Sequence, residues 1–138
     1  MTEFLIDSNV IIDVATDDPQ WGDWSGTTLA RCADRGRLAI NPIIYAEVAA
    51  GFDRIERLDE VLPPAMFHRL PLPWDAGFLA GRSYIEYRRR GGMRTSPLPD
   101  FYIGAHAAVH DLTLVTRDAA RYRTYFPRLR LLAPDSIG

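Results

Sequence analysis

Short apolar runs alternate with longer segments of helical spacing along the whole chain. The apolar runs predict strands at Phe4–Ile6, Leu38–Ile40, Phe67–Leu72, Leu112–Thr116 and Leu129–Leu132. Strands that alternate with helices are typical of a mainly parallel sheet with helices on both faces. The pattern therefore predicts an α/β fold, a three-layer α/β/α sandwich whose sheet has four or five strands.

Capping residues and helical spacing predict the helices between these strands. Ser8 and Asn9 can cap a helix that follows the first strand, and Asp18-Pro19 is typical of the start of a second helix. Further helices are expected at residues 42–51, 54–62, 74–90 and 101–110, and a short one after Asp118. Because no repeat, low-complexity tract or long linker divides the chain, residues 1–138 are expected to form a single domain.

The composition says more about the compartment in which the protein works than about the reaction that it performs. The chain is 47% hydrophobic and 25% charged, with a net charge of −2, so it lacks the overall basic excess of many nucleic-acid binders. Its single cysteine, Cys32, excludes a disulfide framework and a cysteine-rich zinc site, and fits a reducing compartment. No signal peptide and no run of about 18 apolar residues is found. A cytoplasmic protein without a membrane partner is expected.

The chain has no lysine, and all 16 basic residues are arginine. This excludes a P-loop and Schiff-base chemistry, because both need a lysine amine. It also disfavours receiver domains and phosphatases of the haloacid-dehalogenase type, which share an aspartate after the first strand. These phosphatases need a second aspartate two positions after the first, where this chain has Asn9.

Four acidic residues are placed where the strands and helices meet: Asp7, Glu47, Asp100 and Asp118. In parallel α/β sheets, ligands bind outside the carboxyl ends of the strands. Three of the four are expected near that rim, and Asp100 joins them if its helix starts on the same side. Singly, each acid has an ordinary explanation as a helix cap or an exposed charge. Together, crowded carboxylates are best stabilised by a hard divalent cation such as Mg²⁺ or Mn²⁺.

These residues carry a resemblance to a known family. Asp7-Ser8-Asn9-Val10, Glu47, Pro99-Asp100 before Ile103–Ala107, and Thr116-Arg117-Asp118 resemble in order and spacing the motifs of PIN domains, especially the VapC-type toxins of bacterial toxin–antitoxin modules. The resemblance implies a Mg²⁺- or Mn²⁺-dependent endoribonuclease that forms a homodimer and is neutralised by a small VapB-like antitoxin.

The resemblance also implies roles for single residues. Asp7 and Asp100 would be the principal metal ligands, and Glu47 and Asp118 would complete the acidic site. Three polar residues would support it: Ser8, Asn9 and Thr116. His106 departs from the small residue that many relatives have. The alternative is a catalytically inactive PIN-like module that binds RNA or protein, which the presence of all four acids disfavours.

Three other features of the sequence bear on function. His106 and His110 have the spacing of a zinc pair, but Ala107 stands where the zinc-protease motif has glutamate. Arginines 82, 88–90 and 94, and arginines 117, 121, 123, 128 and 130, flank Asp100 and Asp118 in sequence, so they could hold phosphates beside an acidic pocket. Trp21 and Trp24 lie three apart on one helical face, which we interpret as a docking face for a helix of the antitoxin.

Overall fold

One five-stranded sheet, in the order β3-β2-β1-β4-β5, forms the centre of the computed structural model, which describes residues 2–134. All four strand pairs are parallel. This confirms the predicted sheet and fixes its number of strands at five. The strands are β1 (Thr2–Ile6), β2 (Gly36–Ile40), β3 (Phe67–Arg69), β4 (Thr113–Val115) and β5 (Leu131–Leu132).

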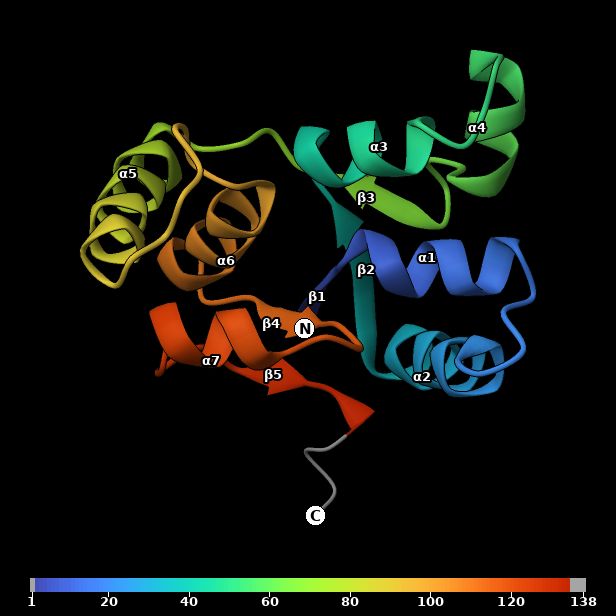
Figure 1. Cartoon of the computed structure of the whole chain (residues 1–138). Helices are drawn as coiled ribbons and strands as arrows, with labels where there is room; N and C mark the ends of the chain where they lie inside the picture. Colours follow the sequence, from blue (N-terminus) through green and yellow to red (C-terminus); the bar gives the residue numbers. More distant parts are fainter. Residues whose placement is uncertain (1, 135–138) are drawn as a thin grey trace.

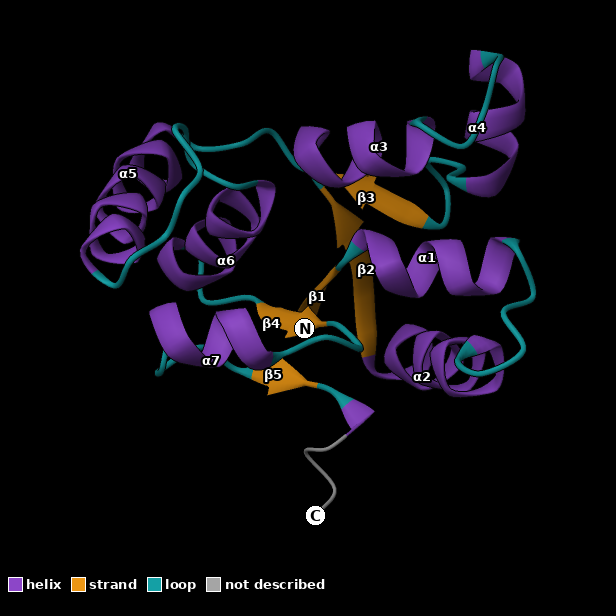
Figure 2. Ribbon diagram, viewed as in Figure 1, coloured by secondary structure: helices purple, strands orange, loops and turns teal. Residues whose placement is uncertain are grey.

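Helices cover the sheet from both sides and confirm the predicted sandwich. Figure 1 shows α5, α6 and α7 on one side of the strands and α1 and α2 on the other, with α3 and α4 beyond the end of β2. The same layers are visible by secondary structure in Figure 2. None of the helices within residues 2–134 is both long and apolar enough to span a membrane. The helices are α1 (Ser8–Ala15), α2 (Gly22–Arg35), α3 (Pro42–Ala49), α4 (Ile55–Val61), α5 (Trp74–Arg89), α6 (Pro99–Val109) and α7 (Ala120–Tyr125).

The direction in which strands are added reverses between β1 and β4. The chain adds β2 and then β3 on one side of β1, and it returns to place β4 on the other side. Ile6 is paired with Val115, and the Asp7 N–H donates to the Val115 carbonyl at 2.9 Å. Such a reversal leaves a crevice outside the carboxyl ends of the two strands, where ligands bind in open α/β sheets. Asp7 and Thr116 are the first residues after these two strand ends.

Local chemistry explains where the element bounds differ from the prediction. The strand expected at 67–72 ends at Arg69 because Pro71 follows and cannot donate to a sheet. The second helix begins at Gly22 rather than near Asp18, because the Asp18 carboxylate accepts from two backbone N–H groups and forms a turn first. The α6 helix begins at Pro99, which puts Asp100 in its first turn.

The inner halves of the strands form the core. Leu5, Ile6, Ala39, Ile40 and Leu114 are at most 1% exposed. Burial on both faces is expected of a parallel sheet that has a helical layer on each side. This packing fixes the backbone positions from which the polar residues at the strand ends project.

Candidate metal centre

Asp7 is the most buried of the four predicted acids, at 3% exposure. It caps α1 by accepting from the Ser8 N–H through Oδ1 at 2.8 Å. Its Oδ2 accepts from the hydroxyls of Thr116 and Tyr122, both at 2.9 Å. Burial raises the pKa of Asp7 to about 6, and the charges of Asp100 and Glu47 add to the effect, although the two hydroxyls oppose it.

Glu47 reaches the same place from α3. Its Oε1 accepts from the Ser8 hydroxyl at 3.0 Å. Partial burial raises the pKa of Glu47, and the charge of Asp100 raises it further. Three helices thus bring Asp7, Glu47 and Asp100 close enough for their charges to affect one another.

Asp100 joins this group from the first turn of α6. Its Oδ1 lies 3.4 Å from the Tyr122 hydroxyl, and its Oδ2 accepts from Arg121 Nη1 at 3.3 Å. Burial and the Asp7 and Asp100 carboxylates raise the pKa of Tyr122, so its hydroxyl remains a proton donor. Asp100 was expected to join the other acids if its helix starts on their side of the sheet. The structure shows this arrangement, because α6 starts beside the Asp7 carboxylate.

Asp118 lies further out than the other three acids. It is exposed, and its backbone N–H donates to the Thr116 hydroxyl at 3.2 Å. It shares with Asp100 the lining of a hollow of about 400 Å³, which is also lined by Arg121 and Tyr125. The structure therefore brings three of the predicted acids together and places Asp118 in the lining of a hollow that it shares with Asp100.

The four acids offer the oxygen ligands that hard divalent cations prefer, but they do not surround a metal ion on all sides. Within residues 2–134, no three His, Cys, Asp or Glu side chains lie close enough together to enclose a metal ion by themselves. A cation held by two carboxylates and several waters fits this spacing, and Mg²⁺ commonly binds in that way. The donor set is all oxygen, and the buried Asp7 carboxylate has two carboxylate neighbours, so the residues fit a hard divalent ion.

The crowding of Asp7 leads to a prediction about stability. Since its folded pKa lies above its unfolded value of 3.8, the ionised carboxylate destabilises the metal-free fold above pH 6. We expect Asp7→Asn to raise the free energy of unfolding at pH 7.5 in EDTA by about 1–2 kcal/mol, a gain of several degrees in Tm. Mg²⁺ should stabilise the wild type and not the variant. A variant less stable than the wild type in EDTA would contradict this account.

A second set of polar contacts fixes the loop between Thr116 and Asp118. Asn9 Nδ2 donates to the Thr116 hydroxyl at 3.2 Å, and Asn9 Oδ1 accepts from the Arg117 N–H at 3.3 Å. Arg117 Nε donates to Oδ2 of Asp13 at 2.7 Å, and Asp13 is 1% exposed. The loop that follows β4 is thereby tied to α1, the helix that Asp7 caps.

The proposed docking face on α2 is partly used within the chain. The Arg117 guanidinium lies over the Trp21 ring at 5.8 Å, and Trp24 packs against the core. Docking of an antitoxin helix on these two rings stays a prediction.

His106 is a buried polar residue of α6, the helix whose first turn carries Asp100. It is fully buried, and its Nδ1 lies 3.0 Å from the Asn41 amide nitrogen. Asn41 caps α3 through Oδ1, so its amide nitrogen is the donor and His106 Nδ1 is the acceptor. Nε2 then carries the proton and is buried without a hydrogen-bond partner among residues 2–134. Burial, with a smaller effect of the neighbouring His110, lowers the pKa of His106 to about 4.

This lowered pKa predicts a loss of stability in acid. Between pH 6.5 and 4 the unfolded chain binds a proton that the folded His106 does not, so the contribution is complete above pH 6.5 and is lost as the pH falls. From pH 7.5 to 4.5 we expect the wild type to lose about 2–3 kcal/mol of unfolding free energy that His106→Gln retains. Urea unfolding at the two pH values measures the difference. Equal losses in the two proteins would show that His106 titrates normally.

Two functional candidates went unrecognised in the sequence. Tyr122 contacts both Asp7 and Asp100, yet nothing in its local pattern distinguishes it from a core aromatic residue. Asp13 resembles any polar residue on an amphipathic helix, and its partner Arg117 lies 104 residues away. Arg121 belonged to a recognised arginine cluster, but its contact with Asp100 had no sequence signal.

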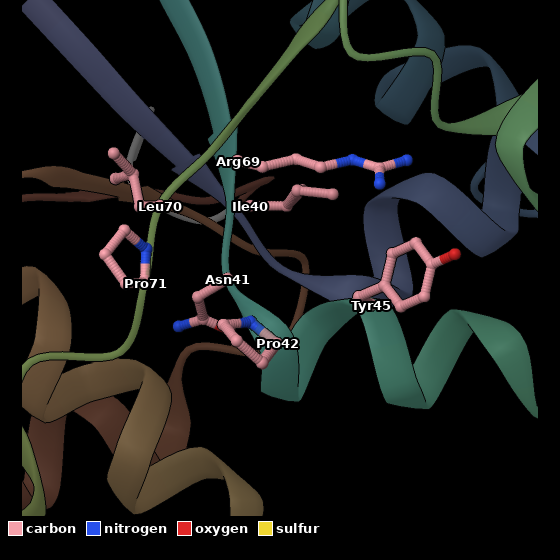
Figure 3. A pocket seen from close by; sticks show the side chains of 7 residues that line it. All are labelled: Ile40, Asn41, Pro42, Tyr45, Arg69, Leu70 and Pro71. Atoms are coloured by element: carbon pink, nitrogen blue, oxygen red, sulfur yellow. The ribbon is translucent and has the colours of Figure 1, made fainter.

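A separate pocket of about 410 Å³ opens where β2 and β3 end (Figure 3). In it, the Arg69 guanidinium lies over the Tyr45 ring at 5.1 Å and donates to Asp59 at 2.9 Å. None of the four predicted acids lines this pocket, so it is distinct from the candidate metal centre. Its lining is Ile40, Asn41, Pro42, Tyr45, Arg69, Leu70 and Pro71.

Solved structures of similar architecture include members of the VapBC family of toxin–antitoxin systems. VapBC2 from Rickettsia felis, bound to a promoter DNA fragment, is 20% identical with a TM-score of 0.74, covering 96% of this chain and 98% of that one. VapBC-1 from nontypeable Haemophilus influenzae is 18% identical with a TM-score of 0.72 and the same coverage. FitAcB from Neisseria gonorrhoeae is 19% identical with a TM-score of 0.66, covering 94% and 96%. At these identities the likeness shows the fold.

The comparison of sequences identifies the family. Among curated proteins, none matches the chain. The family model of the PIN domain matches residues 4–127, a span that runs from within β1 to just beyond α7 and includes all four predicted acids. The chain belongs to the PIN domain family.

Proposed function

We propose that this chain is a metal-dependent endoribonuclease and the toxin of a VapBC-like toxin–antitoxin module. The observation that carries the proposal is the convergence of Asp7, Glu47 and Asp100 at the sheet's reversal, with Asp7 buried and its pKa raised. A fold that only binds a partner gains nothing from placing an ionisable carboxylate there. Membership of the PIN family and the likeness to toxin–antitoxin complexes support the same function.

In this proposal the chain's own residues hold and orient the ligands. Asp7 and Asp100 bind the ion, and Glu47 and Asp118 complete the acidic site. Ser8 holds Glu47 through its hydroxyl, while Thr116 and Tyr122 fix the Asp7 carboxylate. Mg²⁺ or Mn²⁺, when bound, would supply positive charge to the phosphodiester and lower the pKa of the attacking water.

The proposal extends to partners and compartment. An RNA is the substrate, a small VapB-like antitoxin is the inhibitor, and the protein acts in the cytoplasm as a homodimer. Expression of the chain alone should arrest bacterial growth, and co-expression of the protein encoded beside it should restore growth. Arrest by an Asp7→Asn chain of equal abundance would contradict the toxin assignment.

The test of the activity is cleavage of total cellular RNA by the purified, partner-free protein. We expect fragments with Mg²⁺ or Mn²⁺, none in EDTA, and recovery when the metal is restored. Cleavage that persists in EDTA would reject the metal-dependent mechanism. A folded protein that binds RNA and never cleaves it in either metal would favour the rival function, an inactive RNA-binding module.

A further inference from the structure

Two consecutive residues of α7 contact the two oxygens of Asp100. Arg121 Nη1 donates to Oδ2 at 3.3 Å, and the Tyr122 hydroxyl lies 3.4 Å from Oδ1. The two contacts differ in how easily they can be broken. Tyr122 is buried and also donates to Asp7, whereas the Arg121 side chain is 45% exposed. Only Arg121 is therefore free to leave Asp100 without disturbing the core.

A cation at Asp100 and the Arg121 guanidinium compete for the same carboxylate. Both are positive, and both seek the lone pairs of Oδ2, so binding of the ion repels the guanidinium. An exposed ion pair of this kind contributes little stability. Replacing the guanidinium by a cation therefore costs the fold little stability. It leaves the Arg121 side chain unpaired with Asp100 and still beside the acidic group.

The hollow beside Asp100 is where a released Arg121 would act. Arg121 lines it, together with Asp118 and the rings of Tyr87 and Tyr125. The Arg90 guanidinium lies over the Tyr125 ring at 5.4 Å and is paired with Glu86 at 2.9 Å, so a second guanidinium stacks on an aromatic ring of the lining. Guanidinium groups beside aromatic rings are the usual means of binding single-stranded nucleic acid. A strand in this hollow would lie beside Asp100 and Asp118, which both line it.

We infer that Arg121 is a phosphate-binding residue that Asp100 holds until a metal ion displaces it, and that the hollow binds the RNA strand next to the cleaved bond. This inference rests on the proposed function, since it deepens the description of the same site. The arginine serves two states in turn. It neutralises Asp100 without metal and binds the substrate backbone with metal.

This exchange predicts that replacing Arg121 strengthens metal binding and weakens RNA binding. Arg121→Gln should bind Mn²⁺ about two- to fivefold more tightly by calorimetry, because the ion no longer displaces a guanidinium. It should bind a fluorescent single-stranded RNA of mixed sequence about fivefold more weakly in Ca²⁺. The slope of log affinity against log salt concentration should fall by the amount of about one phosphate contact. In EDTA the loss of RNA affinity should be much smaller, because Arg121 is then held on Asp100. A gel of the probe after the Ca²⁺ titration checks that the RNA is intact.

Arg128→Gln is the matched control, because it removes the same charge from an exposed position outside the hollow. It should leave Mn²⁺ binding unchanged and weaken RNA binding equally in Ca²⁺ and EDTA, if at all. Unchanged or weaker Mn²⁺ binding by Arg121→Gln would overturn the exchange, and so would an RNA defect of equal size in both conditions. A wild type that binds no Mn²⁺ would overturn it as well. A wild type that binds Mn²⁺ and RNA but never cleaves would reject the nuclease alone, since these measurements need no catalysis.

Discussion

Asp100→Asn is expected to lower the rate of RNA cleavage at neutral pH by on the order of 1,000-fold, with the fold intact. Asparagine has the same size and can still contact the Tyr122 hydroxyl, so little packing changes. The substitution removes a full negative charge from the group that would hold the ion. Raising the Mg²⁺ concentration should recover part of the rate, because the variant's first defect is metal affinity.

Single-turnover cleavage of one defined RNA measures this effect. Asp75→Asn is a suitable control, since Asp75 also lies in the first turn of a helix and is exposed. It should cleave at the wild-type rate. An Asp100→Asn variant that cleaves within tenfold of the wild type at low Mg²⁺ would remove Asp100 from the proposed metal ligands.

Arg117→Met is expected to destabilise the protein by about 3 kcal/mol, or roughly 10 °C in Tm. Its partner Asp13 is 1% exposed, so removing the guanidinium leaves a buried carboxylate. Within residues 2–134, the hydrogen bond that this carboxylate keeps is the one donated by the Ser25 hydroxyl at 2.9 Å. Thermal and urea unfolding measure the loss. Cleavage should fall as well, because Arg117 anchors the loop that carries Asp118.

Two further variants separate the buried pair from a general effect of lost charge. Arg130→Met removes an ion pair with Asp111 whose side chains are 62% and 74% exposed, so it should cost less than about 1 kcal/mol. Adding Asp13→Asn to Arg117→Met should recover much of the stability, because no buried charge then remains. A double variant as unstable as Arg117→Met would show that the arginine acts through packing on Trp21.

The pattern of the sequence predicted the sheet well because the evidence for it is local. Buried parallel strands read as short apolar runs, and helices between them carry their caps in the adjoining residues. The ends of the strands were less predictable. Pro71 shortens β3, and the length of β5 depends on its pairing with β4, which no single segment reveals.

The candidate site was predictable only in part, for a related reason. Asp7 and Glu47 could be placed because they follow predicted strands, and the rule for parallel sheets then applies to them. Asp118 satisfies the same rule, yet its side chain is exposed whereas that of Asp7 is buried, and the rule does not predict this difference. The contacts of Tyr122 and Arg121 depend on how α7 packs against α6, and helix packing leaves little trace in local spacing.

The central position of β1 has a consequence for the order in which the protein is made. The first strand leaves the ribosome before its neighbours, and its second neighbour, β4, and the tyrosine that fixes Asp7 follow more than 100 residues later. Contacts between such distant segments form slowly and cannot form on an incomplete chain. The nascent polypeptide therefore carries Asp7 and Glu47 without their later neighbours while the segment up to α7 is made, and the candidate site is assembled only when α7 has emerged.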